Sequence, residues 1–222
     1  MPRPPRYLLS QSYYHIMTRG NNKNVVFKTD SDFRYYLKLI YRYKLEYPFD
    51  LYHYCLLPNH THFLIQTKNA LDFAIFMKKL NLAYFHHYRK YYGWVGHFWQ
   101  DRYKSQTVGK DDYFIQCGKY IELNPVRKKL VDNPGKWLHS SYRHYALNVQ
   151  DDLITADIFY NDLGMDLRSR EKNYADLIVD SIVEESYTKK IWGSNNQRYN
   201  EQQKISRKRK KPKSERIREP SP

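Results

Sequence analysis

Hydrophobic residues recur with two different periods along the first 125 residues, and the changes of period divide the chain into strands and helices. Short β-rich runs bounded by Gly, Pro or Asn predict strands, whereas apolar residues spaced three or four positions apart predict helices. The predicted strands span residues 13–18, 49–57, 60–65 and about 97–108, and the predicted helices span residues 30–47, 71–92 and 113–124. The order strand, helix, strand, strand, helix, strand, helix predicts an α+β fold of the split βαβ type.

The predicted helices are amphipathic, and each is expected to bury one stripe of apolar residues. In the first helix the expected stripe contains Phe33, Tyr36, Leu37, Ile40, Tyr41 and Leu45. In the second helix it contains Leu71, Ile75, Leu80, Ala83, Tyr84, His87 and Tyr91. The third helix is expected to end at Asn124, because the residue before Pro125 avoids the α region of backbone conformation.

Two histidines, His60 and His62, open the third predicted strand. Alternate residues of a strand point to the same side, so both imidazoles lie on one face about 7 Å apart along the chain, and Thr61 points to the other. This geometry suits one metal ion. An isolated pair of this kind is also common as surface or structurally satisfied histidines, so a metal site needs a further ligand from elsewhere in the chain.

Tyr120 and Asn124 are four residues apart on the third predicted helix and therefore share a face, with Lys119 and Glu122 turned aside. If this helix packs over the histidine strand, the amide oxygen of Asn124 is a candidate third ligand. Two imidazoles and an amide oxygen would accept Mg²⁺ or Mn²⁺ and leave positions open for substrate. A phenol beside such a metal can form a covalent phosphodiester. By position alone, a tyrosine such as Tyr120 is more often a packing residue than a nucleophile.

The net charge of +15 and the 23 tyrosines favour a nucleic-acid partner with unpaired bases. Residues 1–148 carry 23 Lys and Arg against 10 Asp and Glu, so the folded body is itself basic. Arg19 and Asn21 lie in a Gly/Asn turn suited to phosphate, and Arg102 and Lys104 are expected to share a strand face at the spacing of a nucleic-acid backbone. The alternatives are an ordinary turn and a charged edge strand.

The chain is expected to contain three parts. Residues 1–148 form a catalytic domain, residues 149–193 an acidic and partly helical extension with a helix from residue 174, and residues 194–222 a basic disordered tail. The extension is either a helix docked on the back of the sheet or an acidic cover of the basic cleft. No run of 18 apolar residues and no signal-peptide pattern is present, so we expect a cytoplasmic, nucleoid-associated protein.

Three segments in one order resemble the single-tyrosine HUH transposases, which are IS200-like, and especially the REP-associated tyrosine transposases. They are Leu-Pro-Asn-His-Thr-His at 57–62, Gly-His-Phe-Trp-Gln-Asp-Arg-Tyr-Lys-Ser at 96–105 and Tyr-Ile-Glu-Leu-Asn-Pro-Val-Arg at 120–127. The later Trp-Leu-His-Ser-Ser-Tyr at 137–142 is similar to a further motif of the same group. The resemblance covers about residues 10–146. It implies a ferredoxin-like antiparallel sheet with packed helices.

The resemblance also implies the roles of individual residues. His60, His62 and Asn124 would hold the metal, and Tyr120 would form a 5′-phosphotyrosine link with single-stranded DNA. We add Arg127 to the residues expected to bind DNA. The prediction is a DNA transposase, a monomer or homodimer with no membrane association, that cuts and rejoins hairpin-forming, REP-like palindromic DNA. The alternatives are a replication-initiator or relaxase nicking enzyme and a non-catalytic, domesticated protein that binds nucleic acid.

Overall fold

A four-stranded antiparallel sheet forms the centre of the computed structural model, which describes residues 8–109 and 112–180. The strands are β1 (Tyr13–Arg19), β2 (Phe49–Leu57), β3 (His60–Thr67) and β4 (Lys104–Val108), and they pair in the order β2-β3-β1-β4. Every pairing is antiparallel. This is the ferredoxin-like arrangement, and the predicted α+β class is confirmed. The predicted basic tail lies outside the described residues.

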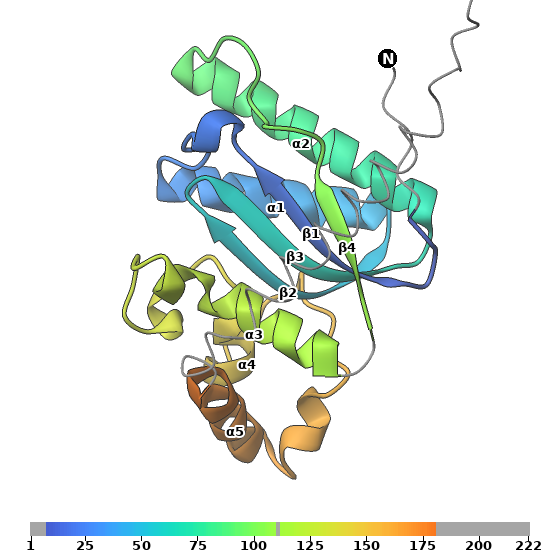
Figure 1. Cartoon of the computed structure of the whole chain (residues 1–222), viewed down its shortest axis with the longest axis vertical. Coiled ribbons are helices and arrows are strands. Elements are labelled where there is room, and N and C mark those ends of the chain that lie inside the picture. Colours follow the sequence, from blue (N-terminus) through green and yellow to red (C-terminus); the bar gives the residue numbers. More distant parts are fainter. Residues whose placement is uncertain (1–7, 110–111, 181–222) are drawn as a thin grey trace, which may run out of the picture. The chain divides into compact units, whose positions relative to one another are not determined.

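The helices form layers on both faces of the sheet (Figure 1). On one face lie α1 (Asp30–Glu46) and α2 (Ala70–Tyr92), which pack against each other. On the other face lies α3 (Asp112–Arg127), with α4 (Tyr142–Leu147) and α5 (Leu167–Asp180) beyond it. Short 3₁₀ turns occur at Asn21–Lys23, Pro134–Lys136 and Tyr160–Leu163. No helix in the described part of the chain is long and apolar enough to cross a membrane.

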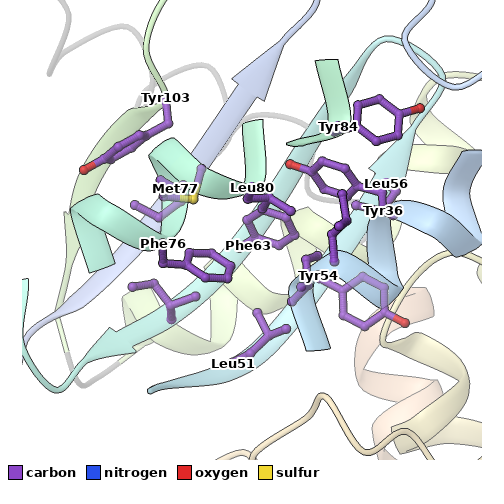
Figure 2. Close-up of a cluster of buried hydrophobic side chains, with 14 of the residues drawn as sticks. Tyr36, Leu51, Tyr54, Leu56, Phe63, Phe76, Met77, Leu80, Tyr84 and Tyr103 are labelled. Carbon is purple, nitrogen blue, oxygen red and sulfur yellow. The ribbon is translucent and has the colours of Figure 1, made fainter. Parts of the chain in front are cut away.

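Two of the apolar cores lie between the sheet and the helices on its two faces. The larger core lies between the sheet and α1 and α2, and Figure 2 shows Tyr36, Phe63, Phe76, Leu80 and Tyr84 packed within it. The smaller core lies between the sheet and α3 and contains Tyr52, Cys55, Leu57, Leu64, Val108, Phe114 and Ile121. Because strand residues alternate, Phe63 and Ile65 enter the larger core while Leu64 faces α3. His60 and His62 have the same parity as Leu64 and so also face α3.

The buried stripes of α1 and α2 differ from the expected ones. Tyr41 and Leu45 of α1 are exposed, and so are Leu71, Ile75 and Tyr91 of α2. The buried residues of α2 are Phe73, Phe76, Met77, Leu80, Tyr84 and Tyr88. They also repeat every three to four positions and include larger aromatic rings, so this competing stripe buries more apolar surface.

The prediction that α3 ends at Asn124 is wrong, because the helix continues through Pro125 to Arg127. Proline has no N–H and cannot donate to the carbonyl of Ile121 four residues earlier. The side-chain Nδ2 of Asn124 lies 3.4 Å from this carbonyl and 2.8 Å from the carbonyl of Tyr120, and it donates to both. Asn124 therefore supplies the hydrogen bond that the proline lacks.

A β-bulge in β2 places two consecutive side chains on the α3 side of the sheet. The pairing register between β2 and β3 shifts between Leu51 and His53. Leu51 and Tyr54 enter the larger core, whereas Tyr52 enters the smaller core and His53 contacts α3. Such bulges redirect a side chain without ending a strand.

Helix α5 begins seven residues before the expected start at residue 174, and it packs against α4 and α3. A docked helix is therefore present, but on the α3 layer rather than directly on the sheet.

Candidate active site

The two histidines of β3 lie side by side on the α3 face, with ring centroids 4.9 Å apart. Both are buried. His60 Nδ1 bonds to Asn59 Oδ1, and His62 Nδ1 lies 2.9 Å from His15 Nε2. Nε2 of His62 is buried and has no hydrogen-bond partner among the described residues. Both rings thus use Nδ1 within the protein, and Nε2 is the atom each offers to a ligand.

His15, on β1, belongs to the site and was not among the predicted residues. Its ring centroid lies 5.1 Å from that of His62. If His62 binds a metal through Nε2, its proton is on Nδ1 and is donated to His15 Nε2, so His15 fixes the tautomer that metal binding needs. In the sequence, His15 shows only as a polar residue within a strand of Tyr, Ile and Met.

Burial keeps the three imidazoles neutral. It lowers the pKa of His15 to about 3. Burial, with the positive charges of Lys128 and Arg19, lowers the pKa of His60 to about 4. The pKa of His62 is far below its usual value, mainly through burial and also through the neighbouring histidines and Lys128. Neutral imidazoles are the form that binds metals, so no proton has to be displaced at pH 7.

Helix α3 brings Tyr120 and Asn124 to these histidines, as expected. The Tyr120 ring centroid lies 5.7 Å from that of His62 and 5.8 Å from that of His15. Asn124 is buried, and because its Nδ2 donates to helix carbonyls, Oδ1 is the atom that can bind a metal. Burial raises the pKa of Tyr120, while Arg127 and a hydrogen bond with Asn124 oppose the rise, so the phenol is protonated at neutral pH.

The donor atoms fit a divalent cation that prefers mixed nitrogen and oxygen ligands. Residues 8–109 and 112–180 contain no group of three or more His, Cys, Asp or Glu placed to hold a metal ion. A site here would use two imidazole nitrogens and one amide oxygen, which suits Mg²⁺ or Mn²⁺ and leaves coordination positions for substrate. The buried, unpartnered Nε2 of His62 favours a ligand at this position, because buried polar atoms are rarely left without one.

Basic residues surround the site. Arg127 Cζ lies 5.2 Å from the Tyr120 ring centroid, and Arg19 pairs across the sheet with His60. Lys128, which was not predicted, is close enough to lower the pKa values of both His60 and His62. Lys104 and His62 both pair with Met17, so they lie on the same face two strands apart. This face is positive towards a phosphate backbone.

The other two residues expected to bind DNA lie outside the regular strands. Asn21 lies in the turn after β1, where its N–H donates to the Phe98 carbonyl at 2.8 Å, and the preceding Gly20 donates to the Asn59 carbonyl at 2.9 Å. Arg102 does not share a strand face with Lys104, because β4 begins at Lys104. Tyr103 and Phe98 are buried in the larger core, and Arg102 is exposed.

Comparisons with known proteins place this geometry in a family. The family model for IS200-like transposases matches residues 8–124. Among solved structures, a REP-associated tyrosine transposase bound to a REP hairpin is similar with a TM-score of 0.57 and 18% identity, over 71% of this chain and 93% of that chain. A protein from Deinococcus radiodurans R1 assigned as a transposase gives a TM-score of 0.34 and 17% identity, over 55% and 96% of the two chains. No curated protein matches the sequence.

Proposed function

Because the chain belongs to the IS200-like transposase family, we propose that it is a metal-dependent transposase that cuts and rejoins single-stranded hairpin DNA through a 5′-phosphotyrosine intermediate. The observation that carries the proposal is the meeting of Tyr120 and Asn124 on α3 with the histidine pair on β3, 5.7 Å between the rings of Tyr120 and His62. The similar structure that is bound to a REP hairpin supports hairpin DNA as the substrate.

In this proposal His60, His62 and Asn124 hold Mg²⁺ or Mn²⁺. The bound ion would polarise the scissile phosphate and offset the charge that develops on it. Tyr120 bonds through its phenol oxygen to phosphorus and gives up its proton, while the bond from phosphorus to the 3′ oxygen breaks and that oxygen takes up a proton. The reverse attack by a 3′ hydroxyl reseals DNA and regenerates Tyr120. The energy of the bond is conserved, so rejoining needs no nucleotide cofactor.

The basic residues around the site would hold the DNA backbone. Arg127 lies beside the Tyr120 ring, Arg19 pairs across the sheet with His60, and Lys104 extends the positive face to the sheet edge. Asn21 and Arg102 are assigned to outer backbone contacts. Contacts of this kind position DNA without reading its sequence. A chromosomal hairpin substrate would place the protein at the nucleoid in the cytoplasm, as a monomer or homodimer.

The proposal is tested by mixing the protein with end-labelled single-stranded hairpin DNA and Mn²⁺ or Mg²⁺ and separating the products on a denaturing gel. A labelled protein band is expected for the wild type and for Tyr113→Phe, which removes another phenol from the same helix. Tyr120→Phe should abolish the band while the protein stays folded, and His60→Ala should lose most of it.

An adduct that persisted in Tyr120→Phe would assign the nucleophile to a different residue. DNA binding with no adduct in the wild type would instead support the non-catalytic nucleic-acid-binding alternative.

A further inference from the structure

A cluster of buried charged and polar side chains lies on the side of α3 that faces away from Tyr120. Glu122 is completely buried, although it follows Tyr120 by only two residues. Two residues correspond to about 200° around a helix axis, so Glu122 and Tyr120 project in nearly opposite directions. Any contact that fixes Glu122 therefore fixes the rotation at which α3 presents Tyr120 and Asn124 to the histidines.

Three different elements hold the two carboxylate oxygens of Glu122. His53 Nδ1, from β2, lies 3.0 Å from Oε1, and the hydroxyl of Ser141, just before α4, donates to the same oxygen. The hydroxyl of Tyr174, from α5, donates to Oε2 at 2.7 Å. These three contacts leave the carboxylate of Glu122 little freedom to move. They therefore also restrict the movement of α3, which carries Glu122.

His53 connects this carboxylate to a second one. Its Nε2 lies 2.7 Å from Asp157 Oδ2, and the other oxygen of Asp157 accepts the backbone N–H of Phe159 at 2.7 Å. Burial alone would lower the pKa of His53, but hydrogen bonds and charges from Asp157 and Glu122 outweigh it and raise the pKa to about 9. The ring is therefore an imidazolium ion between two carboxylates. Buried charges are retained only when they are paired in this way.

Gly118 permits the close approach of α3 to this ring. A Cβ atom at residue 118 would lie 2.9 Å from His53 Nε2 and 3.0 Å from His53 Cδ2. Gly118 precedes Glu122 by four residues and shares its face of the helix. The bulge in β2 directs the His53 ring towards α3, and Gly118 leaves space for this ring. Gly118 thus sets the distance between α3 and β2, next to the place where Glu122 sets the rotation of α3.

Within the part of the chain that the structure describes, the cluster leaves no room for a substrate. His53 and Glu122 are buried, and the adjoining cavity, which is lined by Gly118, Asp157 and Tyr174 among others, has a volume of about 30 Å³. That volume is enough for about one water molecule. The ionisable groups of the cluster consequently act on α3 and not on a ligand.

We propose that His53, Glu122, Asp157 and Tyr174, named here the α3 anchor, are positioning residues that set the rotation and height of α3 and so aim Tyr120 and Asn124 at the metal site. The inference rests on the proposed function. Asp157 and Tyr174 lie beyond residue 124, where the family match ends, so the later part of the chain completes the catalytic domain. The anchor does not touch the reacting groups.

The test compares Tyr174→Phe with Tyr160→Phe in the full chain. Each change removes one hydroxyl that donates a hydrogen bond on the α3 side of the sheet. The Tyr160 hydroxyl donates to the Tyr145 carbonyl at 2.8 Å, whereas the Tyr174 hydroxyl donates to Glu122. Three quantities are measured: thermal unfolding, the single-turnover rate of adduct formation at saturating DNA, and the nuclear Overhauser contact between the Tyr120 and His62 rings. The last needs neither metal nor DNA.

Similar losses of thermal stability are expected in the two variants, but only Tyr174→Phe should slow adduct formation, by about tenfold, and weaken the ring contact. Mn²⁺ affinity should also fall severalfold in Tyr174→Phe, and this loss should vanish when Asn124→Ala is already present. The rate of adduct formation in Glu122→Gln, which keeps the shape of the side chain, should lie between the rates of wild type and Glu122→Ala. Glu122→Gln replaces Tyr174→Phe in the comparison if Tyr174→Phe does not fold.

An unchanged rate and an unchanged ring contact in Tyr174→Phe, or equal changes in Tyr160→Phe, would overturn the anchor. If the wild type forms no adduct, the proposed function fails, and the ring contact alone then decides whether the anchor positions α3.

Discussion

At the scale of single residues, the site depends on which atom of each side chain the protein already uses. His60 and His62 use Nδ1, and Asn124 uses Nδ2 on the carbonyl that Pro125 leaves without a donor. The remaining atoms, two Nε2 and one Oδ1, are the ones a divalent cation can bind. The spacing of the residues predicted which side chains meet. It could not predict these atoms, because His15 lies 47 positions from His62 and the role of Asn124 depends on a helix that continues through proline.

The contact between His15 and His62 leads to a prediction about metal affinity. His15→Phe keeps a ring of similar size but removes the acceptor for His62 Nδ1–H, so the ligand is no longer held in one tautomer. Mn²⁺ affinity, measured by titration of the purified protein, should fall by about tenfold or more. His87→Phe is the control, since His87 stacks on Tyr35 on the opposite layer. An equal fall in both variants would show that His15 has no specific role.

At the scale of secondary structure, the strand and helix order was predictable and the bulge was not. Every residue of β2 except Asp50 is buried, so the strand lacks the polar and apolar alternation that would show which side each residue faces. Glu122 was predicted to turn aside from Tyr120, and it does. Its burial was not foreseen, because its partners His53 and Tyr174 lie 69 positions before it and 52 after it. Local periodicity carries no information about such contacts.

The role of Gly118 in the approach of α3 to His53 can be tested directly. Alanine normally stabilises a helix relative to glycine by about 1 kcal/mol. Gly118→Ala should do the reverse, lowering the free energy of unfolding by roughly 1–3 kcal/mol, because the new methyl group collides with the His53 ring. Urea denaturation measures the change. In a His53→Ala background the same substitution should be neutral or stabilising, and a destabilisation of equal size in both backgrounds would locate the collision elsewhere.

At the scale of the whole molecule, opposite charges lie on opposite sides of α3. The α3 face of the sheet carries the basic residues around Tyr120, whereas the acidic part of the chain contributes Asp157 to the buried anchor. A separate extension from residue 149 remains a prediction of the sequence. The contacts of Asp157 with β2 and of Tyr174 with α3 show that residues on both sides of that boundary share one buried cluster. Composition indicates the acidic character of this segment but not which of its carboxylates is buried.

The anchor predicts how stability depends on pH. The pKa of His53 is raised to about 9 from 6.5 in the unfolded chain, so its contribution is complete below pH 6.5 and is lost as the pH rises through 9. A shift of this size corresponds to roughly 3 kcal/mol. The groups facing the ring are Glu122, Asp157, Tyr145 and Tyr174, and the pKa values of both tyrosines lie well above 10.

The measurement is the free energy of unfolding in urea between pH 6.5 and pH 9.5. Wild type should lose more stability across this range than His53→Gln, which cannot be protonated. The thiols of Cys55 and Cys117, whose pKa values are raised by burial, cause a loss near the upper end of the range in both proteins. The lowered pKa values of His15, His60 and His62 affect stability mainly as the pH falls below 6.5, where the unfolded chain takes up protons. Parallel curves for the two proteins would show that His53 is not charged in the folded state.

The contacts of the anchor can form only late in the synthesis of the chain. Its hydrogen bonds join residues separated by 52, 69 and 104 positions, and the last of them to be synthesised is Tyr174. While the chain emerges from the ribosome, the histidine pair and Tyr120 are complete some fifty residues before the contact that fixes α3 can form. In the proposed function, a nascent chain therefore carries Tyr120 and the histidine pair before the anchor can aim Tyr120, so the capacity to break DNA would be acquired late in synthesis.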